Sequence, residues 1–261
     1  LNTDTYHLLD RRNIEEMKGG AYIINTGRGP LTTRVTRHGP PLSGRLGVMR
    51  VTVLGASGRT GIHVVRLLRG RGHQVRAGLR SRRRAEEVAG LGVETVVADV
   101  TADAEDLVEA LAGSEVVISA IGAPDPDQAS VDLVDRDGVI TAIRAAEKAG
   151  VSRFVLLSAQ FADSPDQGDR LVRSILMAKQ ISDSILRRSS LNWTIVRPGT
   201  LTDDQPSGHV KIAGHLEPGR VSRADVAAVM VATLEEPLTE NQGFDVIGGD
   251  IPIPSALASF S

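Results

Sequence analysis

The chain has 261 residues, 41% of them hydrophobic, which is enough to bury a sizeable core in one large α/β domain or two small ones. It has no cysteine, which excludes disulfides, thiolate metal sites and a cysteine nucleophile. The net charge of −2 gives no reason to expect nucleic acid as a partner, and no apolar run is long enough to span a bilayer. We therefore expect a soluble cytoplasmic protein, monomeric or homodimeric, that acts on a small molecule.

Residues 1–48 are predicted to be an appendage without a fold of its own, because so short a piece cannot bury a core. Residues 4–31 contain a short helix pattern, a β-rich run and an Arg-Gly pair, and they resemble a fragment of the D-isomer-specific 2-hydroxyacid dehydrogenases. The resemblance implies that Arg28 matches the substrate-binding arginine of that family, although the downstream Glu and His of its active site have no counterpart here. Residues 32–48 hold three Arg, three Gly, two Pro and no acid, and are predicted to be a linker. Met49 then opens a run that is typical of the natural beginning of a protein.

From Met49 onward, short apolar runs typical of buried strands alternate with segments of helical spacing. The predicted strands are Val51–Leu54, Gln74–Leu79, Glu94–Ala98, Glu115–Ala120, Arg153–Ser158 and Trp193–Arg197. The predicted helices are Thr60–Leu68, Arg83–Ala89, Ala104–Leu111, Ser130–Ala149 and Leu171–Arg188. This alternation predicts an α/β fold with a Rossmann-like, doubly wound parallel sheet, as a single domain over residues 49–261. Trp193 is expected to lie in the core.

A glycine-rich turn follows the first predicted strand and opens the first helix. Its first glycine permits a tight turn, its second lets the backbone approach a pyrophosphate, and its third lets the helix pack close to the strand. Free N–H groups and the helix dipole then favour the phosphates of a dinucleotide. The candidate cofactor-binding residues of this turn are Gly55, Ser57, Gly58, Arg59, Thr60 and Gly61.

The end of the second strand predicts NADP rather than NAD as the cofactor. An NAD-selective site places an acid there, whereas this chain has Arg80 followed by three further arginines at 82–84. An arginine can pair bidentately with a 2′-phosphate, and no carboxylate is expected near enough to repel it. Arg80 and Arg83 are the candidate ligands. The alternative for the arginines at 82–84 is a solvated helix start.

Residues 49–261 as a whole resemble the atypical short-chain dehydrogenase/reductases, in the branch with NmrA-like and biliverdin/flavin-reductase-like proteins. The residues that carry the resemblance are the glycine turn, Ser158, Ala178, Lys179, Asp183, Leu186, the runs Leu191–Gly199 and Leu201–Asp203, and Ser222–Val226.

The resemblance implies further contacts to the dinucleotide, all at the carboxyl ends of strands, where ligands of such sheets bind. Asp99 and Val100 would meet the adenine edge. The residues Ala120, Ile121 and Gly122 would approach the adenosine ribose. Pro198 and Gly199 would shape the nicotinamide pocket through their backbone.

Ordinary members of this family use a Ser-Tyr-Lys set in which the tyrosine, four residues before the lysine, gives or takes the proton. Here the matching lysine is Lys179, and position 175 is Ile175. The chain's two tyrosines, Tyr6 and Tyr22, both lie in the appendage. Since hydride transfer needs only a positioned nicotinamide and an acceptor, we expect an acceptor such as a flavin or quinone that can take its proton from water.

The candidate catalytic residues are Ser158 and Lys179, and each has a structural alternative. Ser158 would orient a substrate carbonyl, or it is a polar strand end. Lys179 would contact the ribose, or it is an ordinary exposed helix lysine. His209 and His215 lie in the expected substrate loop, where a histidine could supply a proton or simply be solvated.

The function expected from the sequence is an NADP-dependent oxidoreductase. The alternative is a non-catalytic NADP(H) redox sensor, which the NmrA-like relatives suggest. Sugar-nucleotide epimerisation is disfavoured because it also depends on the absent tyrosine and needs a larger substrate region than residues 200–261 provide. A metal hydrolase has no ligand cluster to support it.

Overall fold

The computed structural model describes residues 47–123, 127–166 and 170–260, and all structural statements below concern these residues. The predictions for residues 1–46, including Arg28 and most of the linker, lie outside the described residues.

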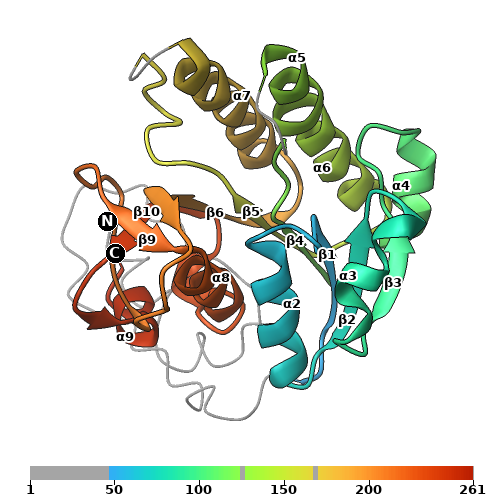
Figure 1. Cartoon of the computed structure of the whole chain (residues 1–261), viewed down its shortest axis with the longest axis horizontal. Coiled ribbons are helices and arrows are strands. Elements are labelled where there is room, and N and C mark those ends of the chain that lie inside the picture. Colours follow the sequence, from blue (N-terminus) through green and yellow to red (C-terminus); the bar gives the residue numbers. More distant parts are fainter. Residues whose placement is uncertain (1–46, 124–126, 167–169, 261) are drawn as a thin grey trace, which may run out of the picture. The chain divides into compact units, whose positions relative to one another are not determined.

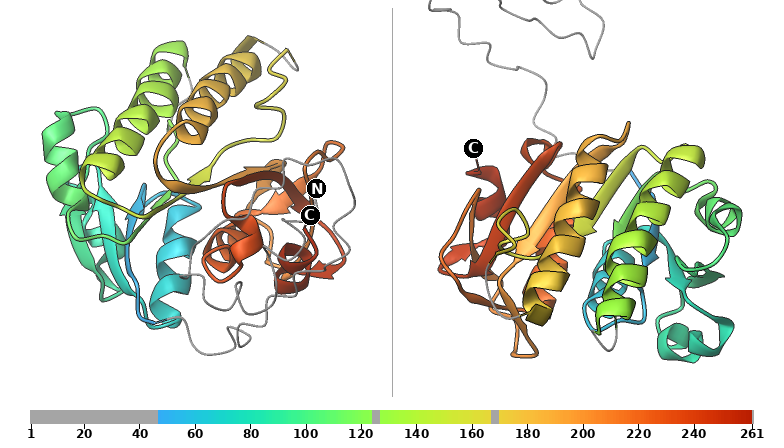
Figure 2. Two further views of the ribbon diagram at one scale, coloured as in Figure 1. Left: turned by 180° about the vertical axis from the view of Figure 1, so that it is seen from behind. Right: turned by 90° about the horizontal axis from the view of Figure 1, so that it is seen from above.

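Nine strands of the described chain form one twisted sheet, shown in Figures 1 and 2, in the order β11-β8-β10-β6-β5-β4-β1-β2-β3. All neighbours from β10 to β3 run parallel, whereas β8 pairs antiparallel with both β10 and β11. The strands are β1 (Arg50–Leu54), β2 (Gln74–Leu79), β3 (Glu94–Val97), β4 (Val116–Ser119), β5 (Arg153–Leu157), β6 (Asn192–Pro198), β8 (His209–Ala213), β10 (Gln242–Gly248) and β11 (Ile251–Pro252). A separate parallel pair consists of β7 (Thr200–Thr202) and β9 (Arg220–Ser222).

Helices cover both faces of the sheet, as the sequence predicts. Figure 1 shows α6 and α7 on one face and α2 and α8 on the other. Each face has its own apolar core, built mainly from Val, Leu, Ile and Ala. The helices are α2 (Gly61–Gly70), α3 (Glu86–Ala89), α4 (Ala104–Leu111), α5 (Gln128–Ser130), α6 (Val139–Lys148), α7 (Arg170–Arg187), α8 (Arg223–Ala232) and α9 (Ile253–Ala258).

Two predicted helices differ from the observed ones. The segment predicted as a helix over Arg83–Ala89 is a 3-10 turn at Arg82–Arg84 followed by the single turn of α3. The long helix predicted over Ser130–Ala149 is interrupted by a π-helical stretch, Val131–Gly138, which we call the π-segment. Such wide turns are rare and are frequently found at functional sites.

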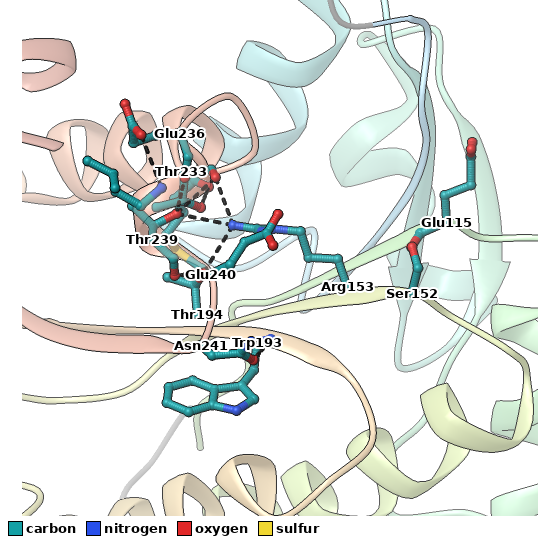
Figure 3. Close-up of polar contacts among 12 residues, drawn as sticks. Glu115, Ser152, Arg153, Trp193, Thr194, Thr233, Glu236, Thr239, Glu240 and Asn241 are labelled. Atoms are coloured by element: carbon teal, nitrogen blue, oxygen red, sulfur yellow. Dashed lines mark hydrogen bonds and ion pairs between the residues drawn. The ribbon is translucent and has the colours of Figure 1, made fainter. Parts of the chain in front are cut away.

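A buried arginine ties the amino ends of β5 and β6 to the segment that follows α8, as Figure 3 shows. The Arg153 Nη2 donates to Thr194 Oγ1 (3.2 Å), to the Thr233 carbonyl (2.8 Å) and to Thr239 Oγ1 (3.1 Å). Its Nη1 lies 2.9 Å from Glu240 Oε1. This network lies at the amino ends of the parallel strands, away from the carboxyl ends where ligands bind, so its role is structural.

No helix within the described ranges is both long and apolar enough to cross a membrane.

Candidate dinucleotide-binding site

The strand order reverses between β1 and β4, which makes their carboxyl ends the switch point where an open α/β sheet binds its ligand. Gly55 follows β1 with a φ of 72°, a conformation that favours glycine. A Cβ on Gly55 would lie 2.7 Å from the carbonyl oxygen of Ala120, the residue that follows β4. The two segments therefore meet at the switch point only because residue 55 has no side chain.

The glycine turn presents several uncommitted backbone amides. Gly58 N donates to the Gly55 carbonyl (2.9 Å), and Ile62 N donates to the Gly58 carbonyl (3.0 Å). In the described part of the chain, by contrast, the amides of Ser57, Arg59, Thr60 and Gly61 donate to no acceptor. Together with the positive end of α2, these four amides can cradle an anion.

One carboxylate lies closer to this turn than the sequence indicates. Glu87 is near enough to Ser57 for the serine hydroxyl to help lower the pKa of its carboxyl group, after the larger effect of Arg84. The Arg84 Nη2 is 3.0 Å from Glu87 Oε2. The expectation that no carboxylate lies near the arginines at 80 and 82–84 is therefore wrong, but the charge of Glu87 is neutralised by Arg84.

Three arginines remain available for a 2′-phosphate. Arg80 directly follows β2, and Arg82 and Arg83 lie in the 3-10 turn. All three are exposed, and within the described chain none of them forms an ion pair. The amide of Ala56 donates to the carbonyl of Gly78 in β2 (3.3 Å), which places this strand end beside the glycine turn.

Arg59 is held by a weak exposed ion pair on the other side of the turn. Its Nη1 lies 3.5 Å from Asp203 Oδ2, and Asp203 Oδ1 lies 2.8 Å from Arg223 Nη1. Exposed pairs of this kind contribute little to stability, so the Arg59 guanidinium can exchange Asp203 for an anionic ligand.

Asp99 and Val100 directly follow β3, where Asp99 forms hydrogen bonds within its own loop and Val100 contacts a neighbouring segment. The Asp99 Oδ1 accepts from the amide (3.0 Å) and the hydroxyl (2.8 Å) of Thr101, which leaves Oδ2 uncommitted. Val100 packs against Gly138 at the end of the π-segment, where a Cβ would come within 2.6 Å of the valine Cγ2. Asp99 therefore stabilises its own loop through Oδ1, and its Oδ2 can accept a hydrogen bond from a ligand.

Lys179 is buried, so of its two alternatives the ordinary exposed helix lysine is wrong. It is 6% exposed and its Nζ lies 2.9 Å from Oδ1 of Asp135, a residue that is 5% exposed. The Lys179 Nζ also donates to the carbonyl of Ile121 (3.3 Å), and the Ala123 amide donates to Asp135 Oδ2 (2.9 Å). Lysine, aspartate and the chain that follows β4 thus form one cluster at the switch point.

Asp135 was not among the predicted site residues, although the sequence contains a signal for it. The residue lies four positions after Val131 and four before Val139, and all three are buried. An acid on the apolar stripe of a predicted helix is typical of a buried charge with a partner.

Ser158 lies just after β5, among polar side chains of which Asp183 and Arg197 are also buried. Its Oγ and Asp183 Oδ1 make no hydrogen bond of ordinary geometry within the described residues. Burial raises the pKa of the Asp183 carboxyl group, and the nearby Ser158 hydroxyl and the charge of Arg197 counter part of that rise. The Arg197 Nε is 3.3 Å from Asp183 Oδ2, and its Nη1 is 2.9 Å from Asp163 Oδ2.

Pro198 and Gly199 continue from β6 into tight backbone packing. A Cβ on Gly199 would lie 2.4 Å from the Gly219 carbonyl oxygen. The position of the ordinary family's tyrosine is occupied by the partly buried Ile175 on α7, one turn before Lys179.

His209 and Trp193 differ from expectation, whereas His215 lies where it was expected. His209 begins β8 rather than lying in a loop, and its ring faces the Ser207 carbonyl. His215 does lie in the loop after β8, with 78% of its side chain exposed and Nδ1 3.6 Å from Asp163 Oδ2. Trp193 is only partly buried, with the Arg187 guanidinium 5.9 Å from its ring centre, and it packs at the margin of the core rather than inside it.

A cavity of about 380 Å³ lies along α7 rather than at the glycine turn. It is lined by the charged side chains of Asp163, Asp183, Arg187, Arg188 and Arg197 together with uncharged residues. No residue of the turn contributes to it, so we do not assign it to the dinucleotide.

The switch point fits a nicotinamide dinucleotide on its own geometry. The uncommitted amides can take the pyrophosphate, the arginines after β2 can take a 2′-phosphate, and the buried lysine lies beside the chain that follows β4. The unpartnered Ser158 hydroxyl supplies one more buried polar atom at the end of β5.

Comparisons with known proteins agree with this geometry. A family model described as NAD(P)H-binding matches residues 55–237. A second model, the NAD-binding domain of D-isomer specific 2-hydroxyacid dehydrogenases, matches residues 1–36, which confirms the resemblance noted for that segment.

Three related proteins illustrate the range of this family. A Bacillus subtilis protein named as the sugar epimerase YhfK is 36% identical over 211 residues, 80% of this chain and 99% of that protein. The NAD(P)H azoreductase of Xenophilus azovorans is 30% identical over 207 residues, 76% of this chain and 68% of that enzyme. The solved structure of ChuY, an anaerobilin reductase from Escherichia coli O157:H7, has a TM-score of 0.66 and 27% identity, covering 77% of this chain and 98% of ChuY.

Proposed function

Because the chain belongs to the NAD(P)H-binding family, as an atypical short-chain dehydrogenase/reductase, we propose that it is an oxidoreductase that reduces a conjugated small molecule with NADPH. A flavin, a quinone or a similar electron-poor compound is the proposed acceptor. The observation that carries the proposal is the glycine turn at the switch point, with four amides that have no acceptor among the described residues.

The proposed choice of NADPH rests on charge. Arg80, Arg82 and Arg83 are exposed and have no carboxylate partner in the described chain. The acid that does lie near the turn, Glu87, is already paired with Arg84. A dianionic 2′-phosphate would therefore meet unpaired guanidinium groups, whereas the Glu87 carboxylate is already engaged and is not free to accept a hydrogen bond from a ribose hydroxyl.

The proposed acceptor follows from the missing proton donor. NADPH supplies the hydride, and the proton that completes the reduction of a flavin, quinone or azo group can come from water. Ile175 stands where ordinary family members have their tyrosine, so a plain ketone would find no acid there. The names of two relatives, the azoreductase and the anaerobilin reductase, describe reductions of conjugated molecules and support this choice. Epimerase chemistry, as in the name of the Bacillus subtilis relative, depends on the missing tyrosine and is not proposed.

The test is steady-state oxidation of NADPH by the full chain in the presence of a flavin, a quinone, an azo dye and a plain ketone. We expect turnover with at least one conjugated acceptor, slower turnover with NADH, and none with the ketone. If the chain binds NADPH but turns over none of these acceptors, the catalytic part of the proposal is wrong.

Ile175 also favours a second candidate, an NADP(H)-binding redox sensor without catalysis. A sensor would bind the nucleotide without turnover, and its affinity for a protein partner would differ between the oxidised and reduced forms. Equal affinity of a partner with both forms would exclude sensing.

A further inference from the structure

Asp135 and Lys179 form an ion pair that is almost fully removed from solvent. Each side chain is 7% exposed, and the Nζ to Oδ1 distance is 2.9 Å. Both partners also hold the chain that follows β4, since Lys179 donates to the Ile121 carbonyl (3.3 Å) and Asp135 accepts from the Ala123 amide (2.9 Å). The pair therefore holds residues 121–123 at the carboxyl end of β4, where the dinucleotide is proposed to lie.

The π-segment is what brings Asp135 to this place. Its other two acids point outward, where Arg136 pairs with Asp132 (3.0 Å) and Asp137 (2.8 Å). Its last residue, Gly138, packs so closely on Val100 that a Cβ would have no room. The segment thus lies between the end of β3 and Lys179 of α7, and turns one of its three aspartates inward.

The positive charge of Lys179 bears on how tightly the oxidised and the reduced cofactor are bound. A buried ammonium group is unfavourable unless an opposite charge compensates it. In this chain the tyrosine that would stand beside the lysine is replaced by Ile175, and Asp135 is the carboxylate in direct contact. The nicotinamide ring carries a positive charge when oxidised and none when reduced, so an uncompensated lysine nearby would disfavour the oxidised form.

Resting on the proposed function, we infer that Asp135 is a positioning residue that holds Lys179 and residues 121–123 and neutralises the lysine, so that NADP⁺ and NADPH are both retained. Removing the charge of Asp135 alone is expected to weaken the binding of NADP⁺ more than the binding of NADPH. Removing both charges of the pair is expected to return the ratio of the two affinities to its wild-type value.

The experiment is a calorimetric titration of the full chain with NADPH and, separately, with NADP⁺. In Asp135→Asn the ratio of the two dissociation constants should shift by about tenfold against NADP⁺, on the order expected for one uncompensated unit charge. The matched control is Asp132→Asn, which removes an outward acid of the same π-segment and should leave the ratio within about twofold of the wild type.

The double variant Asp135→Leu with Lys179→Met distinguishes charge from packing, and it remains informative if the single variant does not fold. Its ratio should lie within about threefold of the wild-type ratio. An equal loss for both nucleotides in Asp135→Asn, or a ratio that stays shifted in the double variant, would overturn the inference. Wild-type protein that binds neither nucleotide would instead overturn the proposed function.

Discussion

A Cβ atom on Gly61 would lie 2.1 Å from the carbonyl oxygen of Gly55, so the first residue of α2 touches the turn that follows β1. No side chain fits in that contact unless the helix and the strand move apart. The same contact holds the uncommitted amides of the turn in place, which couples the packing of the domain to nucleotide binding.

Gly61→Ala is therefore expected to lower the free energy of unfolding by at least about 2 kcal/mol, because the clash is with backbone that cannot rotate away. Binding of NADPH should be lost with it. The control is Gly70→Ala at the other end of α2, where a Cβ would meet nothing within 4 Å. That variant should be neutral or more stable by up to about 1 kcal/mol. Urea unfolding of both variants checks the pair, and equal stability of the two would contradict the packing argument.

Arg80→Asp is expected to weaken the binding of NADPH by about 10- to 100-fold, since a charge-assisted contact is lost and a repulsive carboxylate is introduced. Affinity for NADH should stay within about threefold, or improve, because an acid at this position can accept from the ribose 2′-hydroxyl. Dissociation constants for both nucleotides provide the measurement. The control is Arg144→Asp, an exposed arginine of α6, which should change neither value. An unchanged preference for NADPH in Arg80→Asp would remove this residue from the site.

The burial of Asp245 predicts a dependence of stability on pH. Desolvation raises the pKa of its carboxyl group above the ordinary value of 3.8, against the opposing hydrogen bond from the Leu216 amide. A carboxyl group whose pKa is raised in the folded state contributes stability below the unfolded-state pKa and loses that contribution as the pH rises through the folded-state value. Asp245→Asn keeps an acceptor for Leu216 but does not ionise. Its stability relative to the wild type should therefore increase from pH 4 to pH 7 in urea unfolding. A constant difference over that range would show that the direction is wrong.

Arg153→Lys is expected to lower the free energy of unfolding by about 2–4 kcal/mol, because the single nitrogen of a lysine cannot replace both Nη2, which binds two hydroxyls and a carbonyl, and Nη1, which pairs with Glu240. NADPH affinity should be nearly unchanged, since the network lies at the amino ends of the strands. Glu240→Gln, which alters only the half-exposed partner of the same arginine, should cost less than about 1 kcal/mol. A large loss of NADPH affinity in Arg153→Lys with normal stability would contradict the assignment of a structural role.

Much of the fold could be predicted because its signals are local. The strands from Val51 to Arg197 are apolar runs bounded by glycine or charge, and the helix over Ala104–Leu111 is observed with the same bounds. The glycine turn combines a fixed spacing with a strand before it and a helix after it. The strands after Arg197 were not predicted: β7, β9 and β11 have only two or three residues, β10 contains two glycines, and the antiparallel pairing of β8 with β10 and β11 is set by tertiary contacts.

The site was less predictable because its polar residues are paired across the fold. The sequence does not reveal that Asp135 and Lys179, which are 44 residues apart, form a pair. The apolar residues of the π-segment have the spacing of an ordinary helix, so its π-helical turns could not be predicted. Glu87 was missed for a similar reason, because its proximity to Ser57 depends on how the segment after β2 packs beside the glycine turn.

The most direct test of the account is a calorimetric titration of the full chain with NADPH and with NADH at neutral pH and low salt. We expect saturable binding at one site, with NADPH bound at least about tenfold more tightly than NADH because of the arginines after β2. No measurable binding of either nucleotide, or tighter binding of NADH, would contradict it.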